Sequence, residues 1–519
     1  MKERWRSLTS SPWAHPLLFA AFPVLFLWSH NLDQGVTPLQ GLSALAAAIS
    51  FALVVLCLLR FFLRDWSRSA VVASVIVVLF LTLGRVRAFM SSGGALPDVF
   101  LMAELLIVSL VAVVAVRKIR PSLALVRTLN LIGIVLIVMN IVPIVAAQES
   151  DTAGSRFPVV AEGLGPSPSS PERDVYYLIF DCYAGAETLS NLYGFDNSGF
   201  YTWLSDHGFE VTEGALANYP QTSHSLASSL NMSYMDDFAR EQGEGSSAWT
   251  PIRRTLQDSA IARTFKAMGY RYEHIGSWWY ATAVDPTADD NYAYGVQTEF
   301  LSEFVSTTAV PMIERLIGVA PSFDEEQWDR VHVQIRALRE IASDPEPTFT
   351  FAHFLLPHTP YIFHADGSFV PSDPDRPVEG AYIDQLKYAN KVIQQVVTDL
   401  QGGPGPAPII VIQSDEGPNP PAVDQRGEVL KSSWAQASDM ELGRKLRILN
   451  AYYLPGDPTT KPYPTITPVN TFRVILNGYF GGSLPLLPDR TYVFTDYDHP
   501  YRFKDVTDRL RGPGYAGRP

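Results

Sequence analysis

Five long apolar stretches in the first 150 residues set the strongest limit on what this chain folds into. Each is long enough, or nearly so, to cross about 30 Å of hydrocarbon as a helix. Four further stretches follow the first, and no small-residue cleavage site ends it, so a cleaved signal peptide is disfavoured. The sequence therefore predicts a bundle of five transmembrane helices within residues 1–147, with spans near 12–30, 41–63, 69–84, 97–116 and 128–147.

Lysine and arginine residues in the short connections predict the orientation of this bundle. Ten of them, including Lys2, Arg4 and Arg6, lie before the first stretch or in the connections after the second and fourth. Only Arg85 and Arg87 lie on the alternate side. Because positive residues are retained in the cytoplasm, the N-terminus is predicted to be cytoplasmic, and five crossings then place the rest of the chain outside. We therefore expect a multi-pass protein of the cell's inner membrane with an extracytoplasmic domain.

The chain after residue 147 differs in composition from the apolar bundle. Residues 148–173 are rich in Pro, Ser and Gly, a composition typical of linkers. They are predicted to connect the bundle to a domain at 174–510, which a short tail at 511–519 follows. The first 150 residues carry a net charge of +6 and the remainder a net charge of −19. This acidic domain excludes a nucleic-acid binder that depends on a basic domain.

Strand-like and helix-like segments alternate in the second domain. Continuous β-branched and aromatic runs at 175–180, 348–356 and 409–412 suit strands that are buried on both faces. Helix-like segments, among them 326–343 and 383–400, lie between these runs. The alternation predicts an α/β domain with a mostly parallel central sheet. Function in such folds gathers at the carboxyl ends of the strands, so the residues directly after each run are the candidates.

Acidic residues and a histidine follow the three predicted strands. Asp181 follows the first, His358 the second, and Asp415-Glu416 the third. Taken singly, an Asp after a strand is more often a helix cap or turn former, and a His between prolines satisfies a loop carbonyl. Together at three strand ends, they are typical of a site for a hard cation.

A hydroxyl nucleophile is available on the segment from Asn218 to Ser225. Thr222 or Ser223 is predicted to lie near the N-terminus of the small-residue helix that follows. Backbone N–H groups there favour an anion, and a metal lowers the pKa of a hydroxyl. The alternative is an ordinary helix cap without chemistry.

The order of these motifs resembles that of the alkaline phosphatase and sulfatase-like superfamily. The motifs are strand–Asp181, Asn-Tyr-x-x-Thr222, Pro-His358-x-Pro-Tyr, and strand–Ser-Asp415-Glu416-Gly-Pro. The chain is similar in particular to the membrane-anchored branch that contains lipoteichoic acid synthase and the phosphoglycerol transferases. In that branch, N-terminal helices precede an extracytoplasmic catalytic domain. The likeness covers 174–505 at the level of motifs and includes a further block that ends in Arg473.

This resemblance implies a role for each residue of the predicted site. Asp181 and Asp415 would be metal ligands, and Thr222 would be both a ligand and the nucleophile. Glu416 stands where the family usually has the His of Asp-His-Gly, and His358 would hold the substrate's phosphate or the leaving oxygen. Such an all-oxygen shell for one divalent cation favours Mn²⁺, with Mg²⁺ or Ca²⁺ as alternatives, over Zn²⁺. Alternatively, Glu416 marks a site that has lost its metal and its chemistry.

Three more residues are candidates for substrate contacts. Arg473 would contact phosphate or else pair with a carboxylate. Trp278 would line a substrate groove or else pack in the core. His274 would contact the substrate or else have a structural role. Cys182 lacks the proline and arginine that the sulfatase nucleophile motif requires. Hydrolysis of sulfate esters is therefore disfavoured, and we interpret Cys182 as a packing residue.

The resemblance implies a metal-dependent phosphotransferase anchored in the membrane. Its donor would be a membrane phospholipid, and its acceptor a glycan or envelope polymer. A phospho-head group such as phosphoglycerol would move between them through a phospho-threonine intermediate. A phosphodiesterase or phosphatase would share the site and use water as the acceptor, and a catalytically dead envelope scaffold is a third interpretation. The sequence leaves the oligomeric state open.

Overall fold

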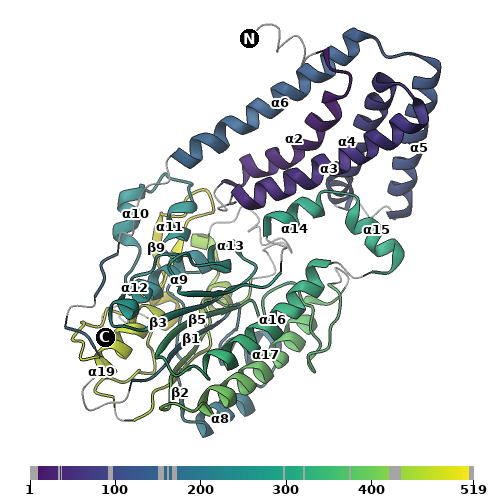
Figure 1. Cartoon of the computed structure of the whole chain (residues 1–519). Helices are drawn as coiled ribbons and strands as arrows, with labels where there is room; N and C mark the ends of the chain where they lie inside the picture. Colours follow the sequence, from purple (N-terminus) through teal and green to yellow (C-terminus); the bar gives the residue numbers. More distant parts are fainter. Residues whose placement is uncertain are drawn as a thin grey trace. The chain divides into compact units, whose positions relative to one another are not determined.

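This computed structural model describes residues 10–32, 36, 38–91, 98–149, 157–160, 163–165, 172–295, 299–319, 322–372, 376–419, 434–456 and 458–512. The chain divides into two compact units, Met1–Ala153 with Val296–Phe323, and Gly154–Gly295 with Asp324–Pro519. Figure 1 labels the helices and strands of both. The residues Lys2, Arg4 and Arg6, most of the predicted linker and the tail from residue 513 onward lie outside the described residues.

Apolar helices make up most of the first unit. Its helices are α2 (Ala14–His30), α3 (Pro38–Leu63), α4 (Trp66–Ser91), α5 (Asp98–Lys118), α6 (Leu123–Glu149), α14 (Glu299–Ser306) and α15 (Val310–Ile317). Among the described residues, four helices are long and apolar enough to cross a membrane, at Gln40–Leu63, Trp66–Ala88, Asp98–Lys118 and Leu123–Ala146. The predicted count of five is confirmed only for these four, because α2 has 17 residues. A helix of that length spans about 25 Å, short of the hydrocarbon thickness.

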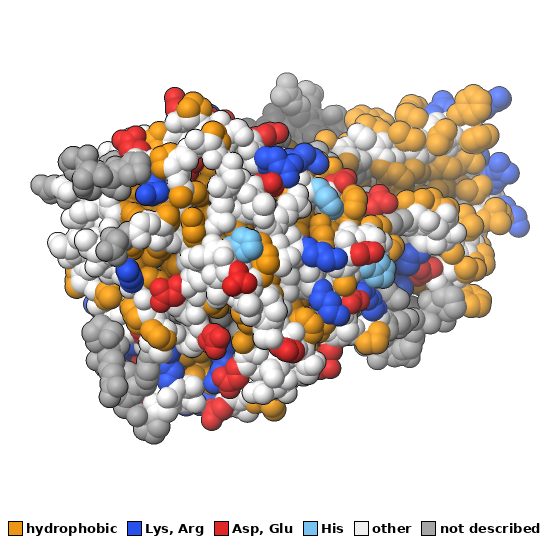
Figure 2. Space-filling model, turned by 90° about the horizontal axis from the view of Figure 1, so that it is seen from below, with side chains coloured by type: hydrophobic (Ala, Val, Ile, Leu, Met, Phe, Trp, Pro, Cys, Tyr) orange, Lys and Arg blue, Asp and Glu red, His pale blue; other side chains and the backbone are white. Residues whose placement is uncertain are grey.

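The buried side chains of this unit include a row of alanines, and many large apolar side chains stay exposed. Ala44, Ala48 and Ala52, spaced four residues apart on α3, are buried, and such spacing lets helices approach closely. Large apolar side chains such as Phe61 and Met139 stay exposed. Hydrophobic side chains gather over these helices in Figure 2. An exposed apolar surface of this kind suits lipid rather than water.

The first unit includes two helices, α14 and α15, that come from far along the sequence. The N–H of Gly84 on α4 donates to the carbonyl of Thr307 at 2.9 Å. Glycine permits this approach, because a Cβ at position 84 would lie 2.0 Å from the carbonyl oxygen of Ser306. The structure thus groups Val296–Phe323 with the apolar helices, although their place in the sequence predicted them in the domain at 174–510.

The second unit is built on a sheet of seven strands. They are β1 (Val175–Phe180), β2 (Phe209–Val211), β3 (Arg271–Ile275), β4 (Asp290–Tyr292), β5 (Thr348–Phe354), β6 (Ile409–Gln413) and β7 (Asn450–Tyr453), in the order β2-β7-β6-β1-β5-β3-β4. The central strand β1 runs parallel to β5 and β6, and β3 runs parallel to β4 and β5. Among the described residues of this sheet, the antiparallel pairs are those of β7 with β2 and with β6. A separate antiparallel pair joins β8 (Tyr492–Phe494) and β9 (Phe503–Asp505). The predicted α/β domain with a mostly parallel sheet is therefore confirmed.

Helices cover both faces of this sheet (Figure 1). Alternate residues of β1 enter two separate cores: Val175, Tyr177 and Ile179 one, and the residues between them the other. This burial on both faces explains the continuous apolar run in the sequence. The helices are α7 (Ala186–Tyr193), α8 (Ser198–Asp206), α9 (Thr222–Leu230), α10 (Asp236–Gln242), α11 (Thr250–Arg254), α12 (Ala260–Ala267), α13 (Tyr280–Ala283), α16 (Ser322–Ile341), α17 (Val378–Gln401), α18 (Asp439–Leu446), α19 (Thr471–Tyr479) and α20 (Thr507–Arg511), with short 3-10 turns at Trp434–Gln436 and Pro468–Asn470.

Candidate active site

Three carboxylates lie at the carboxyl edge of the central strands. Asp181 directly follows β1, and its N–H donates to the carbonyl of Phe354 at the end of β5 at 2.9 Å. Asp415 and Glu416 follow β6, the other neighbour of β1. All three side chains are buried, with exposed fractions of 2%, 1% and 4%. Burial of several like charges is costly unless a cation or ion partner compensates them.

His353, on β5, joins these carboxylates. Its Nε2 lies 3.7 Å from Oδ2 of Asp181. One ligand atom each from Asp181, His353 and Asp415 all lie within 4.8 Å of one another, as do those of Asp181, Cys182 and His358. Sequence reasoning missed His353, although a histidine in an otherwise apolar and threonine-rich strand was a usable signal.

Several buried polar atoms in this cluster have no hydrogen-bond partner among the described residues. They are Oδ1 of Asp181, both carboxylate oxygens of Asp415, Oε2 of Glu416 and Nε2 of His353. Native structures rarely leave so many buried polar atoms unsatisfied in one place. Carboxylate oxygens with one imidazole nitrogen are suitable donors for a divalent cation. The residues present therefore fit a metal, and His353 would add a nitrogen donor to the predicted oxygen donors.

The charges within the cluster shift its pKa values in both directions. Burial raises the pKa of Asp415 well above its ordinary value, and the charges of Asp181 and Glu416 add to this. Burial likewise raises the pKa of Glu416, to about 7. Burial acts to raise the pKa of Asp181 too, but the charges of His358 and His353 outweigh it and lower that pKa. A bound cation would relieve the repulsion among the carboxylates.

A buried lysine compensates Glu416. Lys445 on α18 places Nζ 2.7 Å from Oε1 of Glu416 and 2.7 Å from Oδ1 of Asn419. Burial acts to lower the pKa of Lys445, yet the charge of Glu416 raises it above its ordinary value. The ammonium group therefore stays charged. Sequence reasoning missed Lys445, because α18 has the alternating charges of a solvent-exposed helix.

Thr222 is the first residue of α9, beside the carboxylates. The helix cap is Gln221, whose side chain makes no capping bond, so Thr222 and Ser223 are not the cap residues of this helix. The hydroxyl of Ser225 donates to the backbone carbonyl of Asp415 at 2.6 Å and ties α9 to the end of β6. The Thr222 side chain lies against the Asp415 carboxylate, where it opposes the rise of that pKa caused by burial.

A second cation, Arg253 on α11, lies next to the start of α9. Its Nε donates to the hydroxyl of Ser223 at 3.4 Å. The guanidinium carbon lies 5.3, 5.5 and 6.0 Å from the ring centroids of Trp249, Tyr280 and Trp279, respectively. Such cation–π contacts hold the guanidinium in place. No local motif in the sequence pointed to Arg253.

Cys182 makes a strained turn directly after Asp181. Its backbone φ is +64°, in the left-handed region that residues other than glycine seldom adopt. The hydroxyl of Tyr382 donates to the Cys182 carbonyl at 3.0 Å and accepts the Ala184 N–H at 3.1 Å. Such strain is common at functional sites. Burial raises the pKa of the Cys182 thiol well above its ordinary value, so the thiol is a poor nucleophile.

The remaining predicted residues are His358, Trp278, His274 and Arg473, and each has contacts of its own. The rings of His358 and Trp278 meet edge to face, 6.1 Å between centroids. His274 is buried in β3, where its Nε2 contacts the carbonyl of Thr282 at 3.0 Å, and burial lowers its pKa to about 4. The guanidinium of Arg473 donates to the backbone carbonyls of Met232 and Pro485, at 2.7 and 2.6 Å. Arg473 is thus engaged by the fold and is not brought together with the carboxylates.

Comparison with known proteins gives a family and several distant structural likenesses. The sulfatase family profile matches residues 192–472. The C-terminal periplasmic domain of EcEptC from Escherichia coli, in complex with Zn, is 14% identical, with a TM-score of 0.46 over 70% of this chain and 100% of that one. Lipoteichoic acid synthase LtaP from Listeria monocytogenes is 14% identical, with a TM-score of 0.40 over 66% and 82%. Lipooligosaccharide phosphoethanolamine transferase A from Neisseria meningitidis, an integral membrane protein, is 12% identical, with a TM-score of 0.36 over 85% and 88%. No curated protein sequence matches the chain.

Proposed function

Because the chain belongs to the sulfatase family, and is thus a sulfatase-like enzyme, we propose that it transfers a phospho-head group from a membrane phospholipid to a glycan or envelope polymer. One observation carries this proposal. Thr222 lies at the buried cluster of carboxylates and His353, with cationic side chains nearby. The segment around Thr222 lacks the C/S-x-P-x-R context of a sulfatase nucleophile, and this favours phosphate over sulfate esters.

Asp181, His353 and Asp415, with Thr222 and Glu416, would hold one divalent cation. When bound, the cation supplies Lewis-acid stabilisation and lowers the pKa of a coordinated hydroxyl. We propose Mn²⁺ as the native ion, with Mg²⁺ or Ca²⁺ as alternatives. The carboxylate and hydroxyl oxygens are the donors that these three ions prefer, whereas the imidazole of His353 is a donor that also suits Zn²⁺.

The first half of the reaction would form an ester on Thr222. The Thr222 hydroxyl loses its proton to solvent, and its Oγ bonds to the phosphorus of the donor phosphodiester. The bond from phosphorus to the lipid oxygen breaks. Protonated His358 gives its proton to that departing oxygen, which leaves as the lipid alcohol. In support, the charge of His358 is close enough to lower the pKa of Asp181.

The second half would move the head group to the acceptor. His358, now neutral, takes the proton of an acceptor hydroxyl, whose oxygen bonds to phosphorus. The bond from phosphorus to Thr222 Oγ breaks, and that oxygen regains a proton from solvent. Water in place of the acceptor would give a phosphodiesterase with the same residues.

Two cations would let an acidic domain accept an anionic substrate. Lys445 compensates Glu416, and Arg253 reaches the residue next to Thr222. Tyr497 lies close to both cations. Burial raises the pKa of Tyr497, and the charges of Lys445 and Arg253 act to lower it. Positive groups fixed around a transferring phosphoryl group stabilise the charge of its transition state. We assign this role to Arg253, with Lys445 preventing repulsion by Glu416.

The membrane topology completes this proposal. The count of positive residues in the connections supports a cytoplasmic N-terminus and an extracytoplasmic catalytic unit at the inner membrane. The catalytic unit would then be on the side where envelope polymers are assembled. A lipid donor would reach it from the outer leaflet.

Peptide mass spectrometry of the full chain, incubated with its own membrane lipids and Mn²⁺, tests this function. We expect a metal-dependent adduct on Thr222, whose mass identifies the transferred group. Thr222→Ala should lose the adduct, and Thr398→Ala, a matched change at an exposed position on α17, should keep it. Head groups released to water without an acceptor product would indicate a phosphodiesterase. Turnover by Thr222→Ala at the wild-type rate would contradict the proposal.

A further inference from the structure

The helices α14 and α15 and the turn between them form a hairpin, residues 299–317, that bonds to the backbone of α4. The N–H of Ala309 donates to the carbonyl of Phe80 at 2.8 Å, and the carbonyl of Thr307 accepts the N–H of Gly84 at 2.9 Å. In a regular α-helix, the groups of residues 80 and 84 pair with each other. The turn therefore bonds to the hydrogen-bonding groups of a helix that is long and apolar enough to cross a membrane.

The turn meets α4 below the charged end of that helix. Nε of Arg87 on α4 lies 2.6 Å from Oδ1 of Asp98, the first residue of α5. Charged side chains at the ends of apolar spans lie at the level of the head groups. Gly84 and Phe80 precede Arg87 by three and seven positions, which is about 5–10 Å along the helix axis. The hairpin therefore reaches to the depth of the hydrocarbon.

The turn satisfies its polar backbone groups without water, as a segment at this depth must. The N–H of Thr307 donates to the carbonyl of Phe304 at 3.2 Å, and that of Thr308 to the carbonyl of Val305 at 2.9 Å. The N–H of Val310 donates to the Thr308 hydroxyl at 3.1 Å. Both threonine hydroxyls donate back to α14, at 2.7 Å. With the bond to α4, each N–H group of the turn has a protein acceptor.

The hairpin buries one set of apolar side chains and exposes another. Phe300 and Phe304 on α14 belong to a core cluster with side chains of α2, α3 and α4. Met312 on α15 packs in a second cluster with side chains of α4 and α5. Leu316 and Ile317, at the end of α15, remain 47% and 67% exposed. The packed side chains fix the hairpin in the first unit, and the exposed ones form an apolar face without cover in the described chain.

This face continues the exposed apolar surface of α5. Nε of Arg315 lies 2.7 Å from Oδ2 of Asp98, so the end of α15 lies beside the start of α5 (Figure 1). The exposed apolar residues that follow this ion pair are Leu316 and Ile317 on one helix and Val99 and Phe100 on the other. Arginine and large apolar side chains at one level are typical of the boundary between hydrocarbon and head groups.

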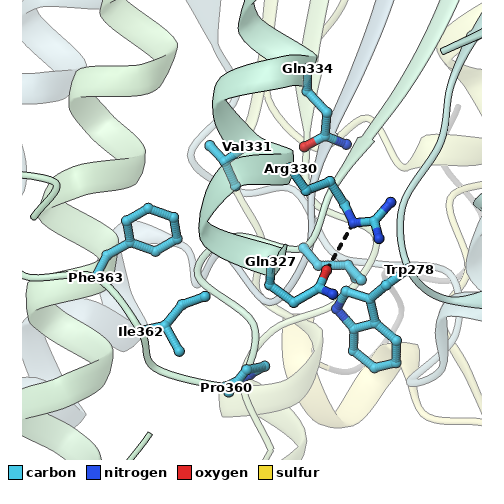
Figure 3. Close-up of a pocket in the computed structure, with 9 residues that line it drawn as sticks. Trp278, Gln327, Arg330, Val331, Gln334, Pro360, Ile362 and Phe363 are labelled. Carbon is cyan, nitrogen blue, oxygen red and sulfur yellow. Dashed lines mark hydrogen bonds between the residues drawn. The ribbon is translucent and has the colours of Figure 1, made fainter. Parts of the chain in front are cut away.

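The hairpin is followed closely in sequence by α16, since only residues 318–321 separate the two. Within α16, Nε of Arg330 donates to Oε1 of Gln327 at 2.9 Å (Figure 3). Gln334 donates from Nε2 to the carbonyls of Gly276 and His353, at 3.0 and 2.8 Å. These bonds fix α16 to the strand that carries His353. A short connection thus joins the hairpin to a helix that supports the candidate active site.

We propose that the hairpin is inserted in the membrane, and that phospholipid acyl chains cover the exposed face at the end of α15. The leaflet is the one at which α4 ends and α5 begins. Because the hairpin lies within the catalytic sequence, the chain passes between the two units three times, at 153–154, 295–296 and 323–324. Insertion therefore attaches the catalytic unit to the membrane by three connections instead of one. This anchoring is independent of whether the enzyme is a transferase or a hydrolase.

Spin labels on the full chain in nanodiscs of phosphatidylcholine and phosphatidylglycerol test the insertion. Ile317→Cys is labelled in a Cys57→Ser background, and the same background without the new cysteine corrects for labelling of the buried Cys182. Power-saturation electron paramagnetic resonance compares collisions with oxygen, which concentrates in hydrocarbon, and with a water-soluble nickel chelate. We expect oxygen to dominate at Ile317→Cys, as at Leu106→Cys on the exposed face of α5. Gln395→Cys, at an exposed position on α17, should show the reverse order.

The two reagents separate the alternatives. Dominance of the nickel chelate at Ile317→Cys would place this face in water and overturn the proposal. Few collisions with either reagent would show that protein, such as a second copy of the chain, covers the face, and would overturn it too. Val99→Cys labels the adjoining end of α5 independently and should match Ile317→Cys. A nickel-dominated signal at Val99→Cys would contradict the common lipid surface.

Discussion

The ammonium of Lys445 and the carboxylate of Glu416 lie 2.7 Å apart, and both side chains are almost fully buried. A lysine in such a position is retained only because a carboxylate pairs with it. In the superfamily that the motifs resemble, a histidine usually occupies the position of Glu416. The extra negative charge of Glu416 is thus matched by a positive charge from α18. This pairing favours a functional site over one that has simply decayed.

Lys445→Met should destabilise the protein. The substitution leaves the buried carboxylate of Glu416 without its partner, and such losses typically cost about 3–5 kcal/mol. Thermal unfolding of the full chain in detergent measures this change. The double variant Lys445→Met with Glu416→Gln should recover most of the loss, and Lys391→Met, at an exposed position on α17, should cost little. Equal melting temperatures for Lys445→Met and the wild type would contradict the importance of the pair.

His353→Ala should weaken cation binding. His353 supplies the nitrogen donor of the group that it forms with Asp181 and Asp415. Its loss should therefore reduce Mn²⁺ affinity by about 10- to 100-fold, the range that changes around metal sites cause. Free Mn²⁺, measured by electron paramagnetic resonance during titration, gives the affinity without relying on activity. His364→Ala, at an exposed position, is the matched control. Unchanged affinity in His353→Ala would show that the cation is held elsewhere.

The strand ends of the site were predictable from sequence, and its compensating groups were not. Asp181 and Asp415 follow continuous apolar runs, and burial on both faces of a parallel sheet produces such runs. Lys445 and Arg253 lie on helices whose local patterns give no indication of the site, and only tertiary packing brings them to it. His353 was missed because its strand was treated as core.

The unit boundary shows a similar limit. Helices α14 and α15 group with apolar helices that lie about 200 residues earlier in sequence. Their contact depends on backbone hydrogen bonds such as that between Gly84 and Thr307. A glycine within an apolar helix indicates only a lower local helix stability. Nothing nearby in the sequence indicates which segment approaches it. Apolar length alone therefore predicted the long helices but not the segment that joins them.

The metal-free protein should lose stability as pH rises from about 5 to 8. Burial raises the folded-state pKa of Glu416 from 4.5 to about 7, so the folded state holds this proton more tightly than the unfolded state does. The resulting stabilisation is complete below the unfolded value and is lost as pH passes the folded value, a change of about 3 kcal/mol. Asp415, whose pKa burial also raises, acts in the same direction.

Melting temperatures in chelator and in Mn²⁺ across this pH range check the expectation. A cation that binds only the folded state should raise the melting temperature most at the higher pH values, where the carboxylates are ionised. Glu416→Gln should flatten the metal-free profile. A metal-free melting temperature that increases with pH over this range would contradict the assigned direction.

Arg253→Ala should lower activity more than it lowers stability. The guanidinium lies among three aromatic rings and contacts Ser223, the neighbour of Thr222. If it stabilises charge on the transferring phosphoryl group, its removal should reduce kcat/KM by about 100-fold or more. Arg253→Lys should recover only part of this, because lysine keeps the charge but loses the planar stacking and the forked donors. Rates of head-group transfer give the measurement, with Arg336→Lys, at an exposed position on α16, as the control. Full activity in Arg253→Ala would assign the arginine to packing of the aromatic rings instead.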